Sequence, residues 1–136
     1  MFFGTFDRHM EKSGRISIPR RFISEPNEVF VLTKGEDSWF VVVHRLKDWE
    51  KILEKAANNP IISMYFKETL ESASKVQIFS RCRIVVPSHL RQYAGIKDEA
   101  TVVGSNSNFE IWDGRRWRDD LTEPAPPDGE IISLLD

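Results

Sequence analysis

The sequence predicts an α+β protein in which two small β-rich repeats pack on each other within one chain, with helices between and flanking them. Three observations support this fold class: an internal repeat, short runs of β-branched residues that end at turn residues, and a middle segment with helical spacing of apolar residues. The 136 residues are 40% hydrophobic and 29% charged, which is ordinary for a protein with a packed core.

The internal repeat is the strongest of these observations. The segment GRISIPRRF, which begins at Gly14, aligns with CRIVVPSHL, which begins at Cys82, at an offset of 68. The same offset aligns VVVHRLKDW, which ends at Trp49, with FEIWDGRRW, which ends at Trp117. The stretch between these segments matches less well, which indicates compensating insertions. Two matched ends at one offset indicate duplication, and two copies are too few for a solenoid, so the halves should pack together.

Each copy begins with a short strand after an arginine. The runs are Ile16–Ile18 in the first copy and Ile84–Val86 in the second, and a proline follows each run and suits the first turn of a helix. In the second copy the segment 87–94 spaces its apolar residues for one helical face, and Gly95 is a natural stop. The segments 28–44 and 100–113 both read as strand, turn, strand.

Two helices are expected between the copies, over residues 46–59 and 60–74, with Pro60 opening the second. The predicted organisation is therefore a first repeat at 5–47, a helical connector at 48–74, a second repeat at 75–118 and an acidic, Pro-rich tail at 119–136. From Glu123 onward the tail reads EPAPPDGEIISLLD, which favours disorder.

The charge distribution matters more than the net charge of −2. Six of the 21 acidic residues follow Arg118 and no Lys or Arg does, so residues 1–118 hold 15 acidic against 19 basic residues, a net charge of +4. The segments 12–21 and 81–91 contain basic residues and no acidic one. Local basic patches of this kind, and not the charge of the whole chain, create the field that attracts phosphate.

Several classes of protein are not indicated. Cys82 is the only cysteine, which excludes an intrachain disulfide and fits a reducing compartment. There is no secretory signal pattern and no apolar run long enough for a membrane helix, so a soluble cytoplasmic protein is expected. The histidines His9, His44 and His89 lack metal-ligand spacing with Cys82, and no nucleophile–base set, P-loop or dinucleotide fingerprint is present. We therefore expect no enzyme, no cofactor, no metal and no small-molecule substrate.

The motifs together resemble one family. The chain starts with MFFG, continues with MEKSGRISIP from Met10 and VQIFSRCRIVVPSHLRQYAGI from Val76, and then has FEIWD and Trp117. In this order and spacing they are similar to the MraZ family, whose proteins contain two AbrB-like, swapped-hairpin repeats of the SpoVT-AbrB type. The resemblance covers residues 1–120. It implies an intrachain pseudo-dimer of swapped hairpins.

The same resemblance implies a function. MraZ proteins are similar to other AbrB-type proteins in binding double-stranded DNA through the loop before each Arg-strand. They act as transcription regulators at the promoter of the division and cell-wall gene cluster in which they are encoded, where ring homo-oligomers bind tandem short repeats. A protein of this kind would work in the cytoplasm in association with the nucleoid.

Residue by residue, the family loop reads Asp, any residue, Lys, Gly, Arg. In the first copy Glu11 stands at the Asp position and Ser13 at the Lys position, while Gly14 and Arg15 match and Lys12 supplies a charge one place early. In the second copy Phe79 stands at the Asp position, Cys82 at the Gly position, and Arg83 matches. Because a cysteine does not easily adopt a positive φ, we expect the second loop to take a different shape.

The predicted DNA-binding residues are Lys12, Ser13, Gly14, Arg15, Arg81 and Arg83. An arginine can grip guanine O6 and N7, or a phosphate, with two parallel hydrogen bonds, and Gly14 lets the backbone come close. Lys12 and Ser13 would contact phosphates, which position the protein without specifying a base. The competing interpretation is that Arg15 is a solvated loop residue or the ion-pair partner of Glu11.

Two other functions stay open. One is a protein-interaction or assembly module in which the basic loops are incidental. The other is an AbrB-type antitoxin, in which the C-terminal tail neutralises a toxin; the duplicated module argues against it, because the usual antitoxin has one module and a longer tail.

Overall fold

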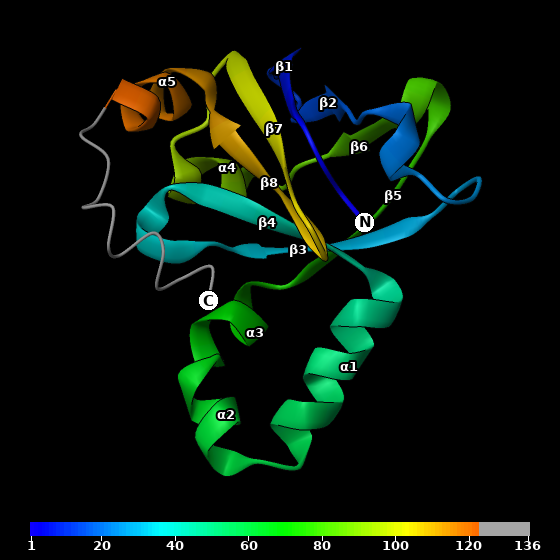
Figure 1. Ribbon diagram of the computed structural model, residues 1–136, viewed down its shortest axis with the longest axis vertical. Helices are drawn as coiled ribbons and strands as arrows, with labels where there is room; N and C mark the ends of the chain where they lie inside the picture. The colour runs from blue at the N-terminus through cyan, green and yellow to red at the C-terminus, as the bar shows by residue number, and fades with distance from the viewer. Residues whose placement is uncertain (123–136) are drawn as a thin grey trace.

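The computed structural model describes residues 1–122, so the tail predicted from Glu123 onward lies outside the described residues. The strands are β1 (Thr5–His9), β2 (Arg15–Ser17), β3 (Val29–Lys34), β4 (Phe40–Arg45), β5 (Ser74–Gln77), β6 (Arg83–Val85), β7 (Glu99–Ser105) and β8 (Asn108–Asp113). The helices are α1 (Leu46–Ala57), α2 (Pro60–Tyr65), α3 (Lys67–Ser72), α4 (Ser88–Ala94) and α5 (Gly114–Thr122) (Figure 1). Short 3₁₀ turns lie at Arg20–Phe22, Glu36–Ser38 and Ser80–Cys82.

The strands form a six-stranded antiparallel sheet, in the order β1-β7-β8-β4-β3-β5, and a separate two-stranded ribbon of β2 and β6. The first strand of each repeat pairs with a strand of the other repeat. β1 pairs with β7 of the second repeat, and β5 pairs with β3 of the first. The predicted α+β pseudo-dimer of swapped hairpins is confirmed.

A pseudo-twofold axis relates the two repeats. In the sheet Val42 lies opposite Glu110, and in the ribbon Ile16 lies opposite Ile84; both pairs are 68 positions apart in sequence. A residue that pairs with its own repeat equivalent lies on the axis that exchanges the repeats. The axis therefore passes between β4 and β8 and through the centre of the ribbon.

The register also locates the compensating insertions that the sequence comparison indicated. His9 and Gln77 are 68 apart, but their partners Glu99 and Val29 are 70 apart, so two residues have been added to the second copy before β7. Six residues separate the partners Lys34 and Val41, and four separate the equivalent partners Gly104 and Phe109. These two extra residues in the first copy restore the offset of 68. The repeats are equivalent in structure despite the mismatch in sequence.

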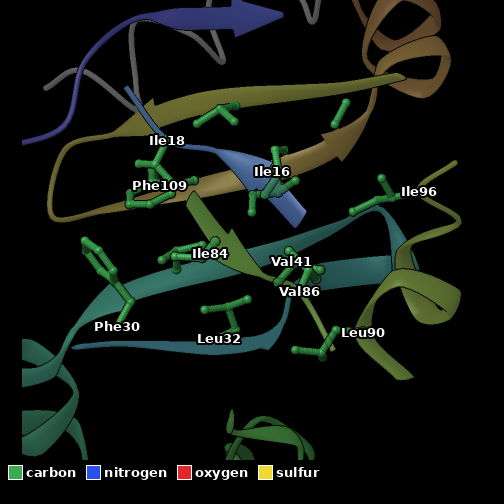
Figure 2. Packing of buried hydrophobic residues seen from close by; sticks show 14 of the residues in the cluster. Ile16, Ile18, Phe30, Leu32, Val41, Ile84, Val86, Leu90, Ile96 and Phe109 are labelled. Atoms are coloured by element: carbon green, nitrogen blue, oxygen red, sulfur yellow. The ribbon is translucent and has the colours of Figure 1, made fainter. Parts of the chain in front are cut away.

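The core lies between the ribbon and one face of the sheet. Figure 2 shows Ile16 and Ile18 from the β2 segment and Ile84 and Val86 from the β6 segment pointing toward the sheet, where Phe109 and its neighbours are buried. Phe2, Phe22 and Phe30 surround Phe109 at ring-centroid distances of 5.0–5.7 Å. Because the alternate residues of each ribbon strand point into this core, the other residues of the ribbon must face outward.

The helices α1, α2 and α3 form an arm that projects from one end of the sheet (Figure 1). The helix predicted over 46–59 is α1, and Asn59 caps the next helix by accepting hydrogen bonds from the amides of Ile61 and Ile62. The single helix predicted over 60–74 is two helices, because the chain leaves helical geometry at Phe66. Several of the apolar residues on this arm are exposed to solvent.

Three elements do not follow from the patterns considered above. The edge strands β1 and β5 mix charged and apolar residues, so their strand character comes from pairing with β7 and β3. The helix α5 follows β8 as α1 follows β4, and it extends to Thr122. The first four residues of the segment assigned to the tail, 119–122, are therefore helical.

Of the three histidines, His44 is a structural residue on the sheet face beneath the arm. Its ring lies 5.3 Å from that of Trp49 and is hydrogen-bonded to the Thr33 hydroxyl at 3.0 Å. Burial lowers the pKa of His44 to about 4, against a smaller opposing effect of Asp48. The imidazole is thus neutral at neutral pH, which suits a polar group held between a strand and a helix.

Candidate nucleic-acid interface

The candidate interface is the outer face of the ribbon together with the two loops that precede its strands, loop 1 (residues 11–14) and loop 2 (residues 79–82). Ile16 and Ile84 point into the core, so Arg15, Ser17, Arg83 and Val85 project from the opposite face. Arg15 and Arg83, two of the three predicted arginines, lie on this face. The sequence assigns them to separate repeats, and the antiparallel pairing of β2 with β6 brings them together.

Loop 1 is a tight turn closed by backbone hydrogen bonds. The Glu11 amide donates to the Arg15 carbonyl at 3.0 Å, and the Gly14 amide donates to the Glu11 carbonyl at 2.9 Å. Gly14 has a φ of +93°, and a Cβ at this position would lie 2.5 Å from the Val86 carbonyl oxygen. A glycine is required here both by the backbone conformation and by the close approach of the second repeat.

The side chain of Arg91, from α4, braces loop 1 from the second repeat. Its Nε donates to the Val86 carbonyl at 2.9 Å and its Nη1 donates to the Lys12 carbonyl at 3.2 Å. In the sequence, Arg91 is recognisable only as a basic residue of the segment 81–91. The structure makes it a positioning residue for loop 1, which sequence could not reveal because the two residues are 79 positions apart.

Loop 2 differs in shape from loop 1, as expected, although Cys82 does adopt a positive φ. In loop 1 only Gly14 has a positive φ, whereas loop 2 has two such residues in a short 3₁₀ turn. Arg81 and Cys82 have φ values of +62° and +57°, so both adopt the left-handed conformation. The Phe79 amide donates to the Arg83 carbonyl at 2.9 Å, which repeats the Glu11–Arg15 bond of loop 1 at the equivalent positions. A φ near +57° is the one positive region open to non-glycine residues, at a modest energetic cost. The two loops therefore share one closing bond.

The two arginines of the ribbon differ in their surroundings. Arg83 is held in place: its Nε donates to the Ser80 carbonyl at 3.0 Å, its Nη1 lies 3.9 Å from a Glu11 carboxylate oxygen, and its guanidinium lies 5.0 Å from the centre of the Phe79 ring. Arg15 is exposed. Within residues 1–122 its side chain makes no ion pair or hydrogen bond, and its guanidinium lies 6.0 Å from the centre of the Phe79 ring. The partner of Glu11 is thus Arg83, and Arg15 remains available to a ligand.

The remaining predicted residues surround these two. Lys12, Ser13 and Arg81 are exposed in the loops, while Gly14, the last residue of loop 1, is buried. Phe79 was noted only as a departure from the family pattern, yet it lies between Arg15 and Arg83 and contacts both. The sequence signal for this role was that Phe79 and Glu11 occupy equivalent positions in the two repeats.

The neighbouring basic residues Arg20 and Arg21 lie in the short 3₁₀ turn after β2. Arg20 is exposed, and the guanidinium of Arg21 lies 4.7 Å from the centre of the Phe6 ring. Glu36 and Asp37 form part of the turn between β3 and β4. In the described part of the chain no group of three or more His, Cys, Asp or Glu side chains could hold a metal ion, and no helix is long and apolar enough to cross a membrane.

A comparison with protein families gives a direct match. The model described as "MraZ protein, putative antitoxin-like" matches residues 1–64 and again residues 69–125. The chain belongs to the MraZ family. The two matched segments correspond to the two repeats of the fold, and the gap between them falls at the break between α2 and α3. The MraZ family is a regulatory, antitoxin-like family and not a family of enzymes.

Proposed function

We propose that this MraZ protein is a sequence-specific transcription regulator that binds tandem repeats of double-stranded DNA upstream of the division and cell-wall gene cluster, as a ring of identical subunits. The observation that carries the proposal is that the two basic loops flank the outer face of one ribbon, one at each end, with Arg15 exposed on that face. A two-stranded β-ribbon fits the major groove of B-DNA, where each base pair presents a distinct pattern of donors and acceptors.

The residues of this interface would have three different roles: base contact, phosphate contact and positioning of a loop. Arg15 is suited to bidentate contact with a guanine, because its planar guanidinium is exposed on a rigid strand. Lys12, Ser13 and Arg81 lie in the loops, where they would contact phosphates on either side of the groove. Arg83 would stabilise the interface mainly by holding loop 2 and Glu11 in place.

One subunit offers few such contacts, so assembly is part of the proposed mechanism. Subunits linked in a ring would bind successive repeats of the DNA at high effective concentration, without any new contact. Repeats spaced by about 10–10.5 base pairs would present the same face of the helix to each subunit. The protein would then act in the cytoplasm, on the nucleoid.

The exposed apolar residues of the arm supply a surface for this assembly. Ile61, Met64 and Tyr65 of α2 are 72%, 75% and 86% exposed. Monomeric proteins seldom display several large apolar side chains together on one element unless they are contact sites. We infer that α2 packs against another subunit.

Replacing Tyr65 with glutamate is therefore expected to reduce the mass of the assembly in solution, because a charge would be buried in the subunit contact. Sedimentation velocity measures the change, and the far-UV circular dichroism spectrum should stay that of the wild type, since Tyr65 is exposed in the single subunit. Lys67→Glu, a charge change on the neighbouring helix α3, is the control. An unchanged sedimentation coefficient for the Tyr65 variant would place the subunit contact elsewhere.

The proposed function is tested by fluorescence anisotropy with DNA from upstream of this gene and a scrambled duplex of the same length. The wild-type protein should prefer the upstream DNA by at least about 1,000-fold, the lower end of the range for specific binders. The affinity for both duplexes should fall steeply as salt is raised, because binding releases counterions from phosphates. Equal, weak binding to both duplexes would contradict the proposal.

The description of the family as antitoxin-like favours one second candidate, a protein that neutralises a toxin. Equal, weak DNA binding combined with tight, salt-insensitive binding of the product of an adjacent gene would support it. Salt-insensitive self-association without either partner would instead support a pure assembly module.

A further inference from the structure

The outer face of the ribbon carries one side chain that neither the basic loops nor the core explains. Val85 is 41% exposed, although the residues on either side of it, Ile84 and Val86, are completely buried. The fold does not use the Val85 side chain to fill its interior. Val85 is the apolar side chain on a face otherwise made of arginine and serine side chains.

Val85 is placed directly beside the most accessible arginine. Arg15 and Val85 are cross-strand partners in the register of β2 and β6. The Val86 amide bonds to the Gly14 carbonyl at 2.9 Å and the Ile18 amide to the Cys82 carbonyl at 2.8 Å. Since hydrogen-bonded and non-hydrogen-bonded pairs alternate along an antiparallel ladder, Arg15 and Val85 form a pair of the second kind, in which the side chains lie closer together.

The equivalent pair at the other end of the ribbon is different. The repeat equivalents of Val85 and Arg15 are Ser17 and Arg83, and these two also lie opposite each other. Thus one end of the ribbon presents an available arginine with an apolar neighbour, and the other presents a tethered arginine with a hydroxyl. The pseudo-twofold symmetry of the backbone is broken at the surface that would face the DNA.

We propose that Val85 contacts the C5-methyl group of a thymine next to the base pair that Arg15 contacts, and that it is a specificity-determining residue of the interface. The inference rests on the proposed function and adds the identity of a base. The thymine methyl is the one apolar group that the edges of the bases present in the major groove, and small apolar side chains are its usual partners. An aliphatic side chain on a rigid strand, beside an arginine, matches it in chemistry and position.

The test replaces the thymines of the upstream repeats by deoxyuridine, which removes the methyl group and keeps the base pairing. The wild-type protein should lose affinity for the deoxyuridine duplex by about fourfold or more, which corresponds to the free energy of burying one methylene-sized group. Val85→Ala should lose a similar factor on the thymine duplex and show no further loss on the deoxyuridine duplex. Replacing one thymine at a time then locates the contacted base.

Two controls make the outcomes distinct. Val42→Ala, the same truncation on the face of the sheet that points away from the ribbon, should keep the full sensitivity to deoxyuridine. Sedimentation velocity should show the same assembly for Val85→Ala as for the wild type.

The inference about Val85 fails alone if the wild type prefers the upstream DNA but binds thymine and deoxyuridine duplexes equally. It also fails if Val85→Ala alters the assembly, because the side chain would then be a subunit contact. If the wild type shows no preference for the upstream DNA, the proposed function fails and the inference falls with it.

Discussion

Replacing Arg15 with alanine should weaken binding to the upstream DNA by roughly 30-fold or more for each contacting subunit, equivalent to about 2 kcal/mol for a lost bidentate contact. The physical reason is that the Arg15 guanidinium is exposed on a rigid strand, and no ion pair within residues 1–122 engages it. Binding to scrambled DNA should change much less. Fluorescence anisotropy on both duplexes, at several salt concentrations, measures the two effects.

The matched control is Arg115→Ala, which removes the same charge from α5, away from the ribbon (Figure 1). It should leave the preference for upstream DNA unchanged. Arg83→Ala should have an intermediate effect, because Arg83 holds Ser80 and faces Glu11 in addition to lining the interface. If Arg115→Ala and Arg15→Ala had equal effects, the ribbon would contribute only its charge, and its role in base recognition would be refuted.

Replacing Gly14 with alanine should lower the free energy of unfolding by about 3 kcal/mol, from a strained backbone and an overpacked contact together. The φ of +93° lies beyond the left-handed region that other residues use, and the new Cβ would lie 2.5 Å from the Val86 carbonyl oxygen. That oxygen cannot move freely, because it accepts a hydrogen bond from Arg91. Urea denaturation measures the loss, and DNA binding should decrease with it as loop 1 shifts.

Cys82→Ala is the control for this prediction, since it changes the repeat-equivalent position without adding a side-chain atom. Cys82 already adopts a φ of +57°, which alanine can share at a similar cost, so the stability should change by less than about 1 kcal/mol. A Gly14→Ala variant as stable as the wild type would show that loop 1 tolerates a side chain, and the account of its geometry given above would be wrong.

The sequence predicted the fold where a pattern is local or repeated. The β-branched runs, the turn at Glu36 and Asp37 and the stop at Gly95 follow from residue chemistry, and Gly95 has the expected left-handed conformation. The duplicated ends of the two copies predict the pseudo-symmetry. Edge strands such as β1 could not be predicted in this way, because its alternation of exposed and half-buried residues depends on a partner strand about 95 positions away.

The candidate site was predictable in part for the same reason. Arg15 and Arg83 are recognisable because they occupy equivalent positions in the two repeats. Their relation to Glu11 and Phe79 was not, since it depends on how closely the two repeats approach. Loop 2 differs in shape from loop 1, as predicted, but the reason given was wrong, because Cys82 does adopt a positive φ in a loop that a hydrogen bond between Phe79 and Arg83 closes.

The exchange of strands between the repeats has a consequence for how the protein folds during its synthesis on the ribosome. Thr5 pairs with Val103 and His9 with Glu99, so β1 has no partner until almost the whole chain has been synthesised. The first repeat cannot close its sheet as a nascent chain, because its ribbon strand β2 also waits for β6. Folding of this kind is dominated by distant contacts and is slow. During synthesis the unpaired edges of the first half are therefore exposed to aggregation and to chaperones for longer than in a protein built from two independent domains.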